Sequence, residues 1–426
     1  MTDNKTSRLR TTLRLLTRVV VCLILIVLFW SCASVPGVKE EAVSNLVKVP
    51  FVRVLLEDQR DNIEISGDAS FAIECLVGDQ QTVYYSSQPV RVENNGSALN
   101  VSNIRGEEIQ NDLTEVNIIP RGSGNRLTVN ERRYRGIMKV VPHGQNIRMV
   151  NILYMEDYLK GVVPPEIGQR TEEEFESVKA QAVAARTYAM AHLQQYGNEP
   201  YDVKSSIIDQ VYEGVGAEQK NVSRAIDATV GEVLTYNDEL IDAYYHSTCG
   251  GMTDDIVDVW DRKEVPYLKP VTDAACSWSK YFNWEETFTE EQLRGRIQQY
   301  LSSDRGREMR IGRITDVSIE GRTAGGRVAT LIVKTTNDTY RFKKDRIRWV
   351  IGRMSNPDLI LPSAGFDVDL RRDNQGRLTK IVFFGRGYGH GVGMCQCGAI
   401  GRARQGWTYD RILTYFYTGI EIKKLY

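Results

Sequence analysis

The chain has 426 residues, enough to bury a large core, and its 54 basic and 55 acidic residues leave a formal net charge of -1. This balance gives no overall basic field that would attract nucleic acid. Hydrophobic residues make up 42% and charged residues 26%, which is typical of an ordinary globular protein and excludes a disordered chain.

The first 34 residues predict export. Arginines between residues 8 and 18 precede an apolar run over residues 19–30, and small residues follow at residues 31–34. A basic stretch, a short apolar stretch and small residues in this order are typical of an export signal. The run is short for a membrane-spanning helix, which needs about 20 apolar residues. We therefore expect residues 1–34 to be a leader and residues 35–48, which are mostly polar or charged, to be a tether.

Cys32 with the residues before it resembles the cleavage box of bacterial lipoproteins, in which the cysteine becomes the lipidated first residue. Phe29 departs from the usual leucine, and Trp30 is bulkier than usual. An uncleaved N-terminal anchor is the alternative. In both cases the body would lie outside the cytoplasm, in the cell envelope, and be held at a membrane.

Residues 49–150 predict an antiparallel β-rich part. Short runs of β-branched residues alternate with Asn-Gly, Ser-Gly and Gly-Asp turn signals. Cys75 falls in one of the predicted strands, as a core thiol.

Residues 151–192 predict the centre of the fold. Thr171 and Glu174 form a capping box at the start of a long helix with an apolar stripe rich in alanine. Glu166 precedes this helix and follows Pro164 and Pro165. A carboxyl group held there among apolar residues would have a raised pKa and suit a general acid, whereas the alternative is a solvated loop glutamate.

The remainder continues the same mixture. We expect a helix over residues 221–230, strands over 232–236 and 240–245, and a β-rich elaboration over 286–380 that begins with a helix. Residues 381–426 hold a short strand, a glycine-rich loop and a closing helix over 409–417. The predicted fold is α+β: one large domain over 49–426, with parts at 49–150, 151–285, 286–380 and 381–426.

Four blocks resemble the stage II sporulation protein D family, which includes lytic transglycosylases and amidase-enhancer proteins of bacterial cell walls. They are VVPPEIG, VKAQAVAARTYA, AYYHSTCGGMT and GYGHGVGMCQCGA, with the tail WTYDRILTYFYTGIEI after the last. They occur in the order seen in the family, and the likeness spans residues 49–426.

The resemblance implies a peptidoglycan lytic transglycosylase with Glu166 as its catalytic residue. Hydrolysing glycosidases usually use two carboxylates. A lytic transglycosylase can use one, because the C6 hydroxyl of muramic acid attacks C1 in place of water. The rival interpretation is a wall-binding activator of an amidase without catalysis of its own.

The resemblance also implies substrate contacts near Glu166. Arg186 interrupts a helix of small residues, so its guanidinium needs an anion or a carbonyl, and it would orient Glu166, bind a substrate carboxyl group or form a structural salt bridge. In the glycine-rich loop, alternating glycines suit a close approach of the backbone to a ligand or to a neighbouring strand. The substrate-binding candidates are Arg186, Tyr188, Gln210, Tyr212, Ser247, Tyr388 and His390.

A second set of candidates is metal-binding. His246 and Cys249 have a spacing that suits a metal, and some family members carry zinc at the histidine of this block. The ligand set here would be His246, Cys249 and Cys276, with Cys395 as a fourth candidate. A Cys249–Cys276 disulfide or free thiols are the alternatives in an exported protein.

A thiol peptidase that uses Cys395 and His390 is a third interpretation. Both residues lie in one glycine-rich loop, whereas catalytic cysteines usually meet a histidine from elsewhere in the chain. Many relatives have serine at the position of Cys395, which also disfavours a thiol peptidase. The expected partners are glycan strands, a membrane and a cell-wall amidase, with no nucleic acid, no required cofactor and zinc only as a structural ion.

Overall fold

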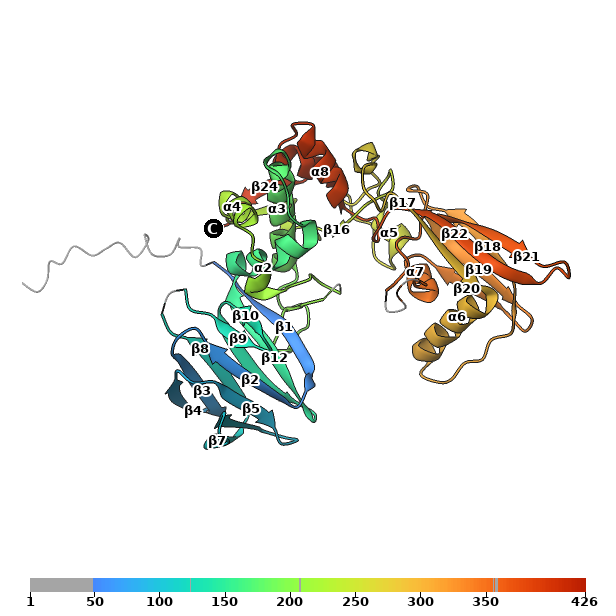
Figure 1. The fold of residues 1–426 in the computed structure, drawn as a ribbon. Helices are drawn as coiled ribbons and strands as arrows, with labels where there is room; N and C mark the ends of the chain where they lie inside the picture. The colour runs from blue at the N-terminus through green and yellow to red at the C-terminus, as the bar shows by residue number, and fades with distance from the viewer. Residues whose placement is uncertain (1–48, 123, 207, 355, 357–358) are drawn as a thin grey trace, which may run out of the picture. The chain divides into compact units, whose positions relative to one another are not determined.

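The computed structural model describes residues 49–426 except 123, 207, 355 and 357–358. The predicted leader, tether and lipidation site at Cys32 lie outside the described residues. Val49–Leu425 forms one compact unit that mixes helices with mainly antiparallel sheets, which confirms the α+β fold (Figure 1). In this described part of the chain, no helix is long and apolar enough to cross a bilayer.

Two sheets build the N-terminal part. Their strands are β1 (Phe51–Arg60), β2 (Asn62–Gly67), β3 (Phe71–Val77), β4 (Gln80–Ser86), β5 (Val90–Asn94), β6 (Leu99–Asn103), β7 (Glu108–Leu113), β8 (Glu115–Pro120), β9 (Leu127–Val129), β10 (Arg132–Tyr134), β11 (Ile137–His143), β12 (Asn146–Tyr154) and β13 (Val203–Lys204). The order is β13-β1-β12-β11-β8-β3-β4 in one sheet and β10-β9-β2-β5-β6-β7 in the other.

Residues of one face of each strand are buried in a shared core. On β3, Phe71, Ile73 and Cys75 are at most 1% exposed, because alternate side chains of a strand point to the same face. Cys75 is therefore a core thiol, as predicted. This core continues into the helices that follow β12.

Helices form the centre of the unit. They are α2 (Met155–Ile167), the 3₁₀ turn η2 (Glu172–Glu174), α3 (Phe175–Ala191), η3 (Gly214–Ala217), α4 (Lys220–Ala228), α8 (Gln396–Arg404) and α9 (Tyr409–Phe416). The capping box of Thr171 and Glu174 is present at η2. α3 packs against α2, α4, α8 and α9, although α8 and α9 are more than 200 residues away in sequence (Figure 1).

The diproline lies inside α2, which corrects the expectation of a loop at Glu166. A proline has no N–H to donate, so Pro165 leaves the carbonyl of Gly161 without its helical partner. The N–H of Glu213 donates to that carbonyl at 3.2 Å instead. A contact from a distant segment thus lets the helix continue to Ile167, and Glu166 occupies its last turn.

The segment 240–245 is not one strand, as the sequence suggested. β14 (Glu232–Tyr236) turns through Asn237 and Asp238, both at positive φ, into the short β15 (Glu239–Leu240). The chain then leaves that sheet and pairs in parallel through β16 (Tyr245–His246) with β23 (Met394–Cys395). β24 (Glu421–Lys424) completes the β14 sheet.

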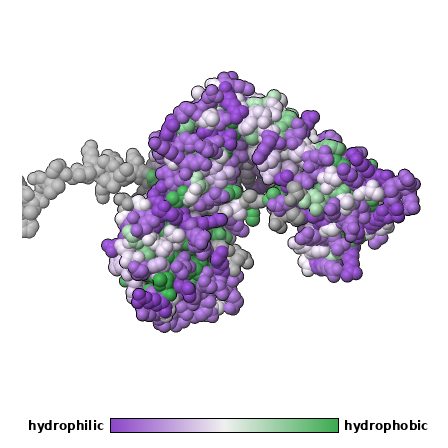
Figure 2. All heavy atoms as spheres, viewed as in Figure 1, coloured by the Kyte–Doolittle hydropathy of each residue, from purple (hydrophilic) through white to green (hydrophobic). Residues whose placement is uncertain are grey.

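A further part holds its own core between two three-stranded sheets and two helices. Its elements, preceded by α5 (Ile256–Val259) and the 3₁₀ turn η4 (Ala274–Cys276), are β17 (Asn283–Thr289), α6 (Glu290–Arg305), β18 (Ile314–Arg322), β19 (Val328–Thr335), β20 (Thr339–Lys343), α7 (Arg346–Ile351), β21 (Phe366–Arg372) and β22 (Leu378–Arg386). The visible face of the molecule is mainly hydrophilic, with hydrophobic residues in small areas (Figure 2).

Candidate active site and a buried cysteine cluster

Glu166 is held in the last turn of α2 by two neutral donors. The N–H of Val211 donates to Oε1 at 3.3 Å, and Nε2 of Gln396 donates to Oε2 in a long hydrogen bond of 3.5 Å. The side chain keeps part of its surface exposed. Glu166 is thus accessible, while among the described residues no cation donates a hydrogen bond to it.

This environment favours the protonated carboxyl group. Burial raises the pKa of Glu166 to about 7, and the hydrogen bonds from Val211 and Gln396 oppose that shift only in part. Near neutral pH the group is therefore divided between acid and base. A carboxyl group of this kind can donate a proton and later take one back.

The segment that contacts Glu166 is fixed by a buried polar network. Gln210, beside Val211, accepts from the hydroxyl of Tyr158 at 2.9 Å, and its amide nitrogen donates to the carbonyl of Ala185 and to the hydroxyl of Tyr245. Gln210 is 1% exposed, and the protein takes up both donors of its amide nitrogen and one hydrogen bond to its oxygen. This network holds Gln210 in place beside the Val211 donor, and the contact of Gln210 with substrate stays a prediction.

Arg186 donates its hydrogen bonds to protein groups other than Glu166. Its side chain is fully buried and forms a bidentate pair with Glu156, at 2.8 Å from Nε to Oε1 and 2.7 Å from Nη2 to Oε2. Nη1 also donates to the carbonyl of Glu232. Of the alternatives, the structural salt bridge holds, and it joins α2, α3 and β14.

Tyr212 is also structural. Its ring is 4% exposed and stacks on Tyr158, and its hydroxyl donates to Oδ1 of Asn151 at 2.7 Å. Ser247 is partly exposed, but its carbonyl accepts the N–H of Cys397 and its hydroxyl contacts Thr248. These contacts hold the surrounding segments together, and the substrate contacts expected of Tyr212 and Ser247 stay predictions.

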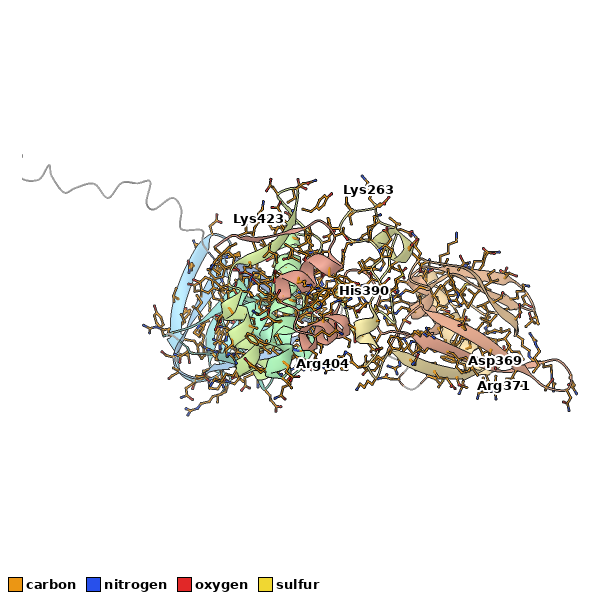
Figure 3. The ribbon with its side chains drawn as sticks, turned by 90° about the horizontal axis from the view of Figure 1, so that it is seen from above. Lys263, Asp369, Arg371, His390, Arg404 and Lys423 are labelled. Atoms are coloured by element: carbon orange, nitrogen blue, oxygen red, sulfur yellow. The ribbon has the colours of Figure 1, made fainter. Side chains whose placement is uncertain are left out.

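Tyr188, Tyr388 and His390 do come together, at a cavity of about 780 Å³. Aromatic rings from several segments surround it, and Asp209 connects it with the segment that binds Glu166. Figure 3 shows His390 away from Asp369 and Arg371, which lie on β21. The lining residues are Tyr188, His192, Gln195, Tyr196, Ile208, Asp209, Tyr244, Trp260, Asp261, Arg262, Asp345, Arg348, Trp349, Leu359, Ile360, Tyr388, Gly389 and His390.

His390 is bound through both ring nitrogens. Nε2 lies 2.9 Å from the carbonyl of Tyr245, and Nδ1 accepts the N–H of Val392 at 3.1 Å. Burial lowers the pKa of His390 to about 4, so the ring is neutral at pH 7. Neither nitrogen is free to take a proton from Cys395, which excludes a Cys395–His390 pair in this arrangement.

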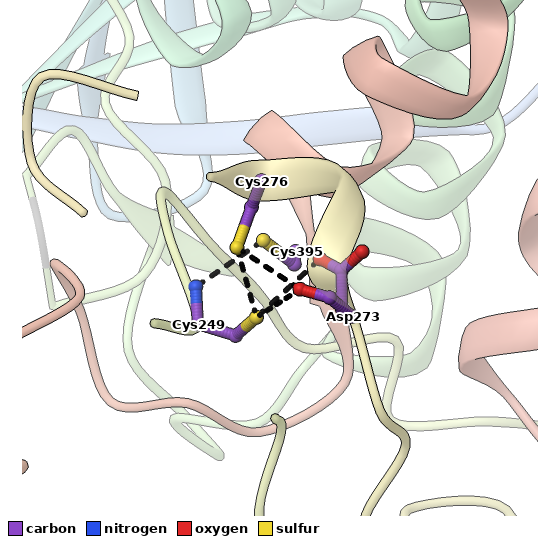
Figure 4. Close-up of side chains that lie close together, drawn as sticks. All are labelled: Cys249, Asp273, Cys276 and Cys395. Carbon is purple, nitrogen blue, oxygen red and sulfur yellow. Dashed lines mark hydrogen bonds between the residues drawn. The ribbon is translucent and has the colours of Figure 1, made fainter. Parts of the chain in front are cut away.

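The cysteines gather in one buried cluster. Ligand atoms of Cys249, Asp273, Cys276 and Cys395 all lie within 4.8 Å of one another (Figure 4). His246 is not among these side chains: its Nδ1 lies 3.1 Å from the carbonyl of Val392, and its Nε2 is buried without a hydrogen-bond partner among the described residues. The cluster thus holds Cys249, Cys276 and Cys395 of the predicted set together with Asp273, which the sequence did not indicate.

No disulfide is formed by the described cysteines, and the sulfur atoms of Cys249 and Cys276 are 3.4 Å apart. Cys395 belongs to the cluster, whereas Cys397 lies outside it and is partly exposed.

Sequence reasoning missed Gln396, Trp260, Trp349 and Asp273. Gln396 stands between the two cysteines of the glycine-rich block, and that position is the one signal for it. Trp260 and Trp349 lie in segments without a recognised motif. Asp273 precedes Cys276 by three residues, a spacing that also occurs in solvated turns.

Comparisons with known proteins agree with the resemblance in the sequence. The family described as Stage II sporulation protein matches residues 143–236, which include Glu166, and a domain of unknown function matches residues 276–393. The chain is 31% identical over 343 residues to an uncharacterised protein of Brachyspira hyodysenteriae, covering 79% of this chain and 85% of that protein.

Two relatives from Bacillus subtilis (strain 168) have functional names. The chain is 31% identical over 286 residues to the stage II sporulation protein D, covering 63% of this chain and 74% of that protein. It is 30% identical over 295 residues to the amidase enhancer, covering 61% of this chain but only 39% of that longer protein. With the motif order, the match to the family and these relatives together, this chain belongs to the stage II sporulation protein D family.

Proposed function

We propose that the protein is an exported, membrane-tethered lytic transglycosylase of peptidoglycan. It cleaves the β-1,4 bond between N-acetylmuramic acid and N-acetylglucosamine. The observation that carries this proposal is the state of Glu166: accessible, bonded by two neutral donors, and with a pKa of about 7. Membership of a family with cell-wall relatives supports the choice of substrate.

Glu166 acts first as an acid and then as a base. The protonated carboxyl group gives its proton to the glycosidic oxygen, and the bond from that oxygen to C1 of the muramic acid breaks. The C6 hydroxyl of the same sugar bonds to C1, and its proton passes to the Glu166 carboxylate. The products are a free 4-hydroxyl on N-acetylglucosamine and a 1,6-anhydro end, and Glu166 is protonated again.

The aromatic cavity supports a glycan substrate. Rings such as those of Trp260 and Tyr388 offer flat apolar faces against which the C–H face of a pyranose packs, while Asp209 and Arg262 supply polar contacts. Asp209 lies two residues before the Val211 N–H that holds Glu166. A strand in the cavity would therefore adjoin the segment that positions the proposed acid.

The direct test is product analysis in water enriched in oxygen-18. Purified glycan strands, with and without stem peptides, are incubated with the full-length protein in detergent, and the fragments are read by mass spectrometry. The proposal predicts anhydro ends without added oxygen-18. Reducing ends that carry oxygen-18 would mean hydrolysis and would overturn the single-residue mechanism.

The second candidate is a wall-binding activator of an amidase. It is favoured by the 30% identity to the amidase enhancer. This alternative predicts that strand length stays unchanged while an added cell-wall amidase works faster. The retained Pro164-Pro165-Glu166 block, in a setting that raises the glutamate pKa, is the observation that favours catalysis.

The location is part of the same proposal. The leader over residues 1–34 would direct export, and Cys32 would carry the lipid that holds the body at the membrane. Mass spectrometry of the mature N-terminus tests this. A lipidated Cys32 is expected, and an unmodified Met1 would contradict the lipoprotein.

A further inference from the structure

We infer that Cys249, Asp273, Cys276 and Cys395 bind one zinc ion in a closed, structural site. Zinc prefers four ligands in tetrahedral geometry, with Zn–S near 2.3 Å and Zn–O near 2.0 Å. A tetrahedron with these bonds has S···S separations of about 3.8 Å and S···O separations of about 3.5 Å. The observed Cys249–Cys276 sulfur separation is 3.4 Å, and Sγ of Cys249 lies 3.3 Å from Oδ2 of Asp273.

The four side chains are buried, at 3% exposure for Cys249 and none for the other three. Arg402 offsets the charge of the Asp273 carboxylate, but the three thiols are costly to bury as thiolates without a further cation. A disulfide between Cys249 and Cys276 would bond only these two cysteines and would offer no ligand bond to Cys395 or Asp273. One divalent ion, in contrast, uses all four groups at once.

Backbone N–H groups already point at the sulfur atoms, as they would toward thiolates. Cys395 Sγ accepts from the N–H of Cys249 at 3.2 Å and of Gly398 at 3.3 Å, and Cys249 Sγ accepts from Gly251 at 3.4 Å. Gly250 and Gly251 also donate to Cys276. Such donors stabilise negative sulfur and orient each ligand.

Asp273 divides its two oxygens between two roles. Nη1 of Arg402, on α8, contacts Oδ1, whereas Oδ2 faces Cys249. The arginine thus fixes the carboxylate and leaves one oxygen toward the cluster. This is the outer support that metal-binding carboxylates commonly have.

The packing of η4 on α8 explains how distant segments meet here. A Cβ atom at Gly398 would lie 1.9 Å from Oδ2 of Asp273, and one at Gly401 would lie 2.1 Å from the carbonyl of Ala275. Only glycine at these two positions of α8 allows the Asp273–Cys276 turn to approach. The glycines that make the segment look like a loop are therefore required by the cluster.

The ion would hold the active site without entering the reaction. Cys395 is the N-cap of α8, and the next residue, Gln396, donates to Glu166. Fixing Cys395 to Cys249 and Cys276 fixes the start of α8 and with it this hydrogen bond. Gln396 is accordingly a positioning residue.

The test measures metal directly and does not depend on catalysis. The full-length protein is purified in detergent with a thiol reductant and without added metal, and its metal content is read by inductively coupled plasma mass spectrometry. We expect about one zinc per chain. Cys276→Ser and Cys395→Ser should each lower the zinc content at least tenfold, whereas the neighbouring Cys397→Ser and the excluded His246→Gln should keep it.

Cobalt substitution and thiol counting complete the test. Protein refolded with Co²⁺ should show thiolate-to-cobalt charge-transfer absorption that Cys397→Ser keeps and Cys395→Ser reduces. Alkylation of the denatured protein purified without reductant should leave every described cysteine labelled. A metal-free protein, whether its five described cysteines are all free thiols or Cys249 and Cys276 form a disulfide, would overturn the inference, and so would full zinc content in Cys395→Ser.

Discussion

Gln396 Nε2 lies 3.5 Å from Oε2 of Glu166 and links the start of α8 to the last turn of α2 across 230 residues of sequence. The same amide nitrogen lies 3.4 Å from Oε1 of Gln181 on α3. These contacts connect the proposed acid on α2 with α8 and, through Gln396, with α3. Burial raises the pKa of Glu166 to about 7, and the hydrogen bonds from Val211 and Gln396 lower it only in part.

Activity should fall as pH rises through about 7. Cleavage needs the protonated carboxyl group, and above its pKa the protonated fraction drops about tenfold per pH unit. We therefore expect kcat/KM on glycan strands to be level between pH 5 and about 6.5 and to decrease above that range. A profile that keeps rising to pH 9 would exclude Glu166 as the acid.

Gln396→Met should shift the decrease in kcat/KM to higher pH. The Gln396 hydrogen bond lowers the pKa of Glu166. Its loss therefore raises that pKa, and kcat/KM begins to fall at a higher pH than in wild type. The pH profile of the variant, measured beside Cys397→Ser as the control, checks this. A decrease that begins at a lower pH than in wild type would contradict the hydrogen bond from Gln396 to Glu166.

The Arg186–Glu156 pair should matter for stability. Arg186→Met removes the bidentate partner of a carboxylate that is 14% exposed, and breaking a buried pair typically costs about 3–5 kcal/mol. The exposed pair of Arg224 and Glu172 is the matched control, since such pairs contribute only about 0–1 kcal/mol. Thermal unfolding of Arg186→Met and Arg224→Met measures the difference. Equal losses would refute the structural role.

Trp349→Ala should weaken glycan binding without unfolding the protein. The ring is 49% exposed and lines the aromatic cavity, so its removal takes away contact area for a sugar and little core packing. We expect KM to rise at least fivefold while the unfolding temperature stays within about 2 °C. Tyr85→Ala, on β4 and 65% exposed, is the control. An unchanged KM would place the glycan elsewhere.

Gly398→Ala should disturb the cysteine cluster, because the added methyl group would meet the carboxylate of Asp273 at 1.9 Å. The zinc content and the unfolding temperature should both fall. Gly295→Ala is the control: it lies exposed in α6 with open space around it, so alanine should stabilise the helix by about 0.5–1 kcal/mol. If Gly398→Ala keeps both its zinc and its stability, the close approach of Asp273 to α8 is not needed for the cysteine cluster.

Local signals predicted the elements that depend on local chemistry. The capping box at Thr171 and Glu174, the helix at α4, the strand β14 and the strands β18 to β20 could be read from the sequence. The helix through Pro164 and Pro165 could not, because the hydrogen bond that Pro165 cannot make to Gly161 is replaced by one from Glu213, in a distant segment. α8 was missed for a similar reason: Gly398 and Gly401 disfavour a helix locally and are needed for packing.

The candidate site shows the same division. The motifs contain Tyr188 and His390, which line the cavity, but also Arg186 and Gln210, which are buried and hydrogen-bonded to other protein groups. Which side a residue faces is decided by tertiary contacts, not by the motif. That Asp273 lies beside the cysteines is seen only in the structure, where η4 packs on α8.

The central claim is that Glu166 alone carries the proton in glycan cleavage. The most direct measurement compares wild type and Glu166→Gln on the same purified strands, with fragments read by mass spectrometry. Glutamine keeps the size of the side chain, and because burial disfavours the ionised glutamate, the variant should be at least as stable as wild type at pH 8. The account predicts anhydro-ended fragments from wild type and at least a thousandfold fewer from the folded variant. Fragments formed at the wild-type rate by Glu166→Gln would contradict it.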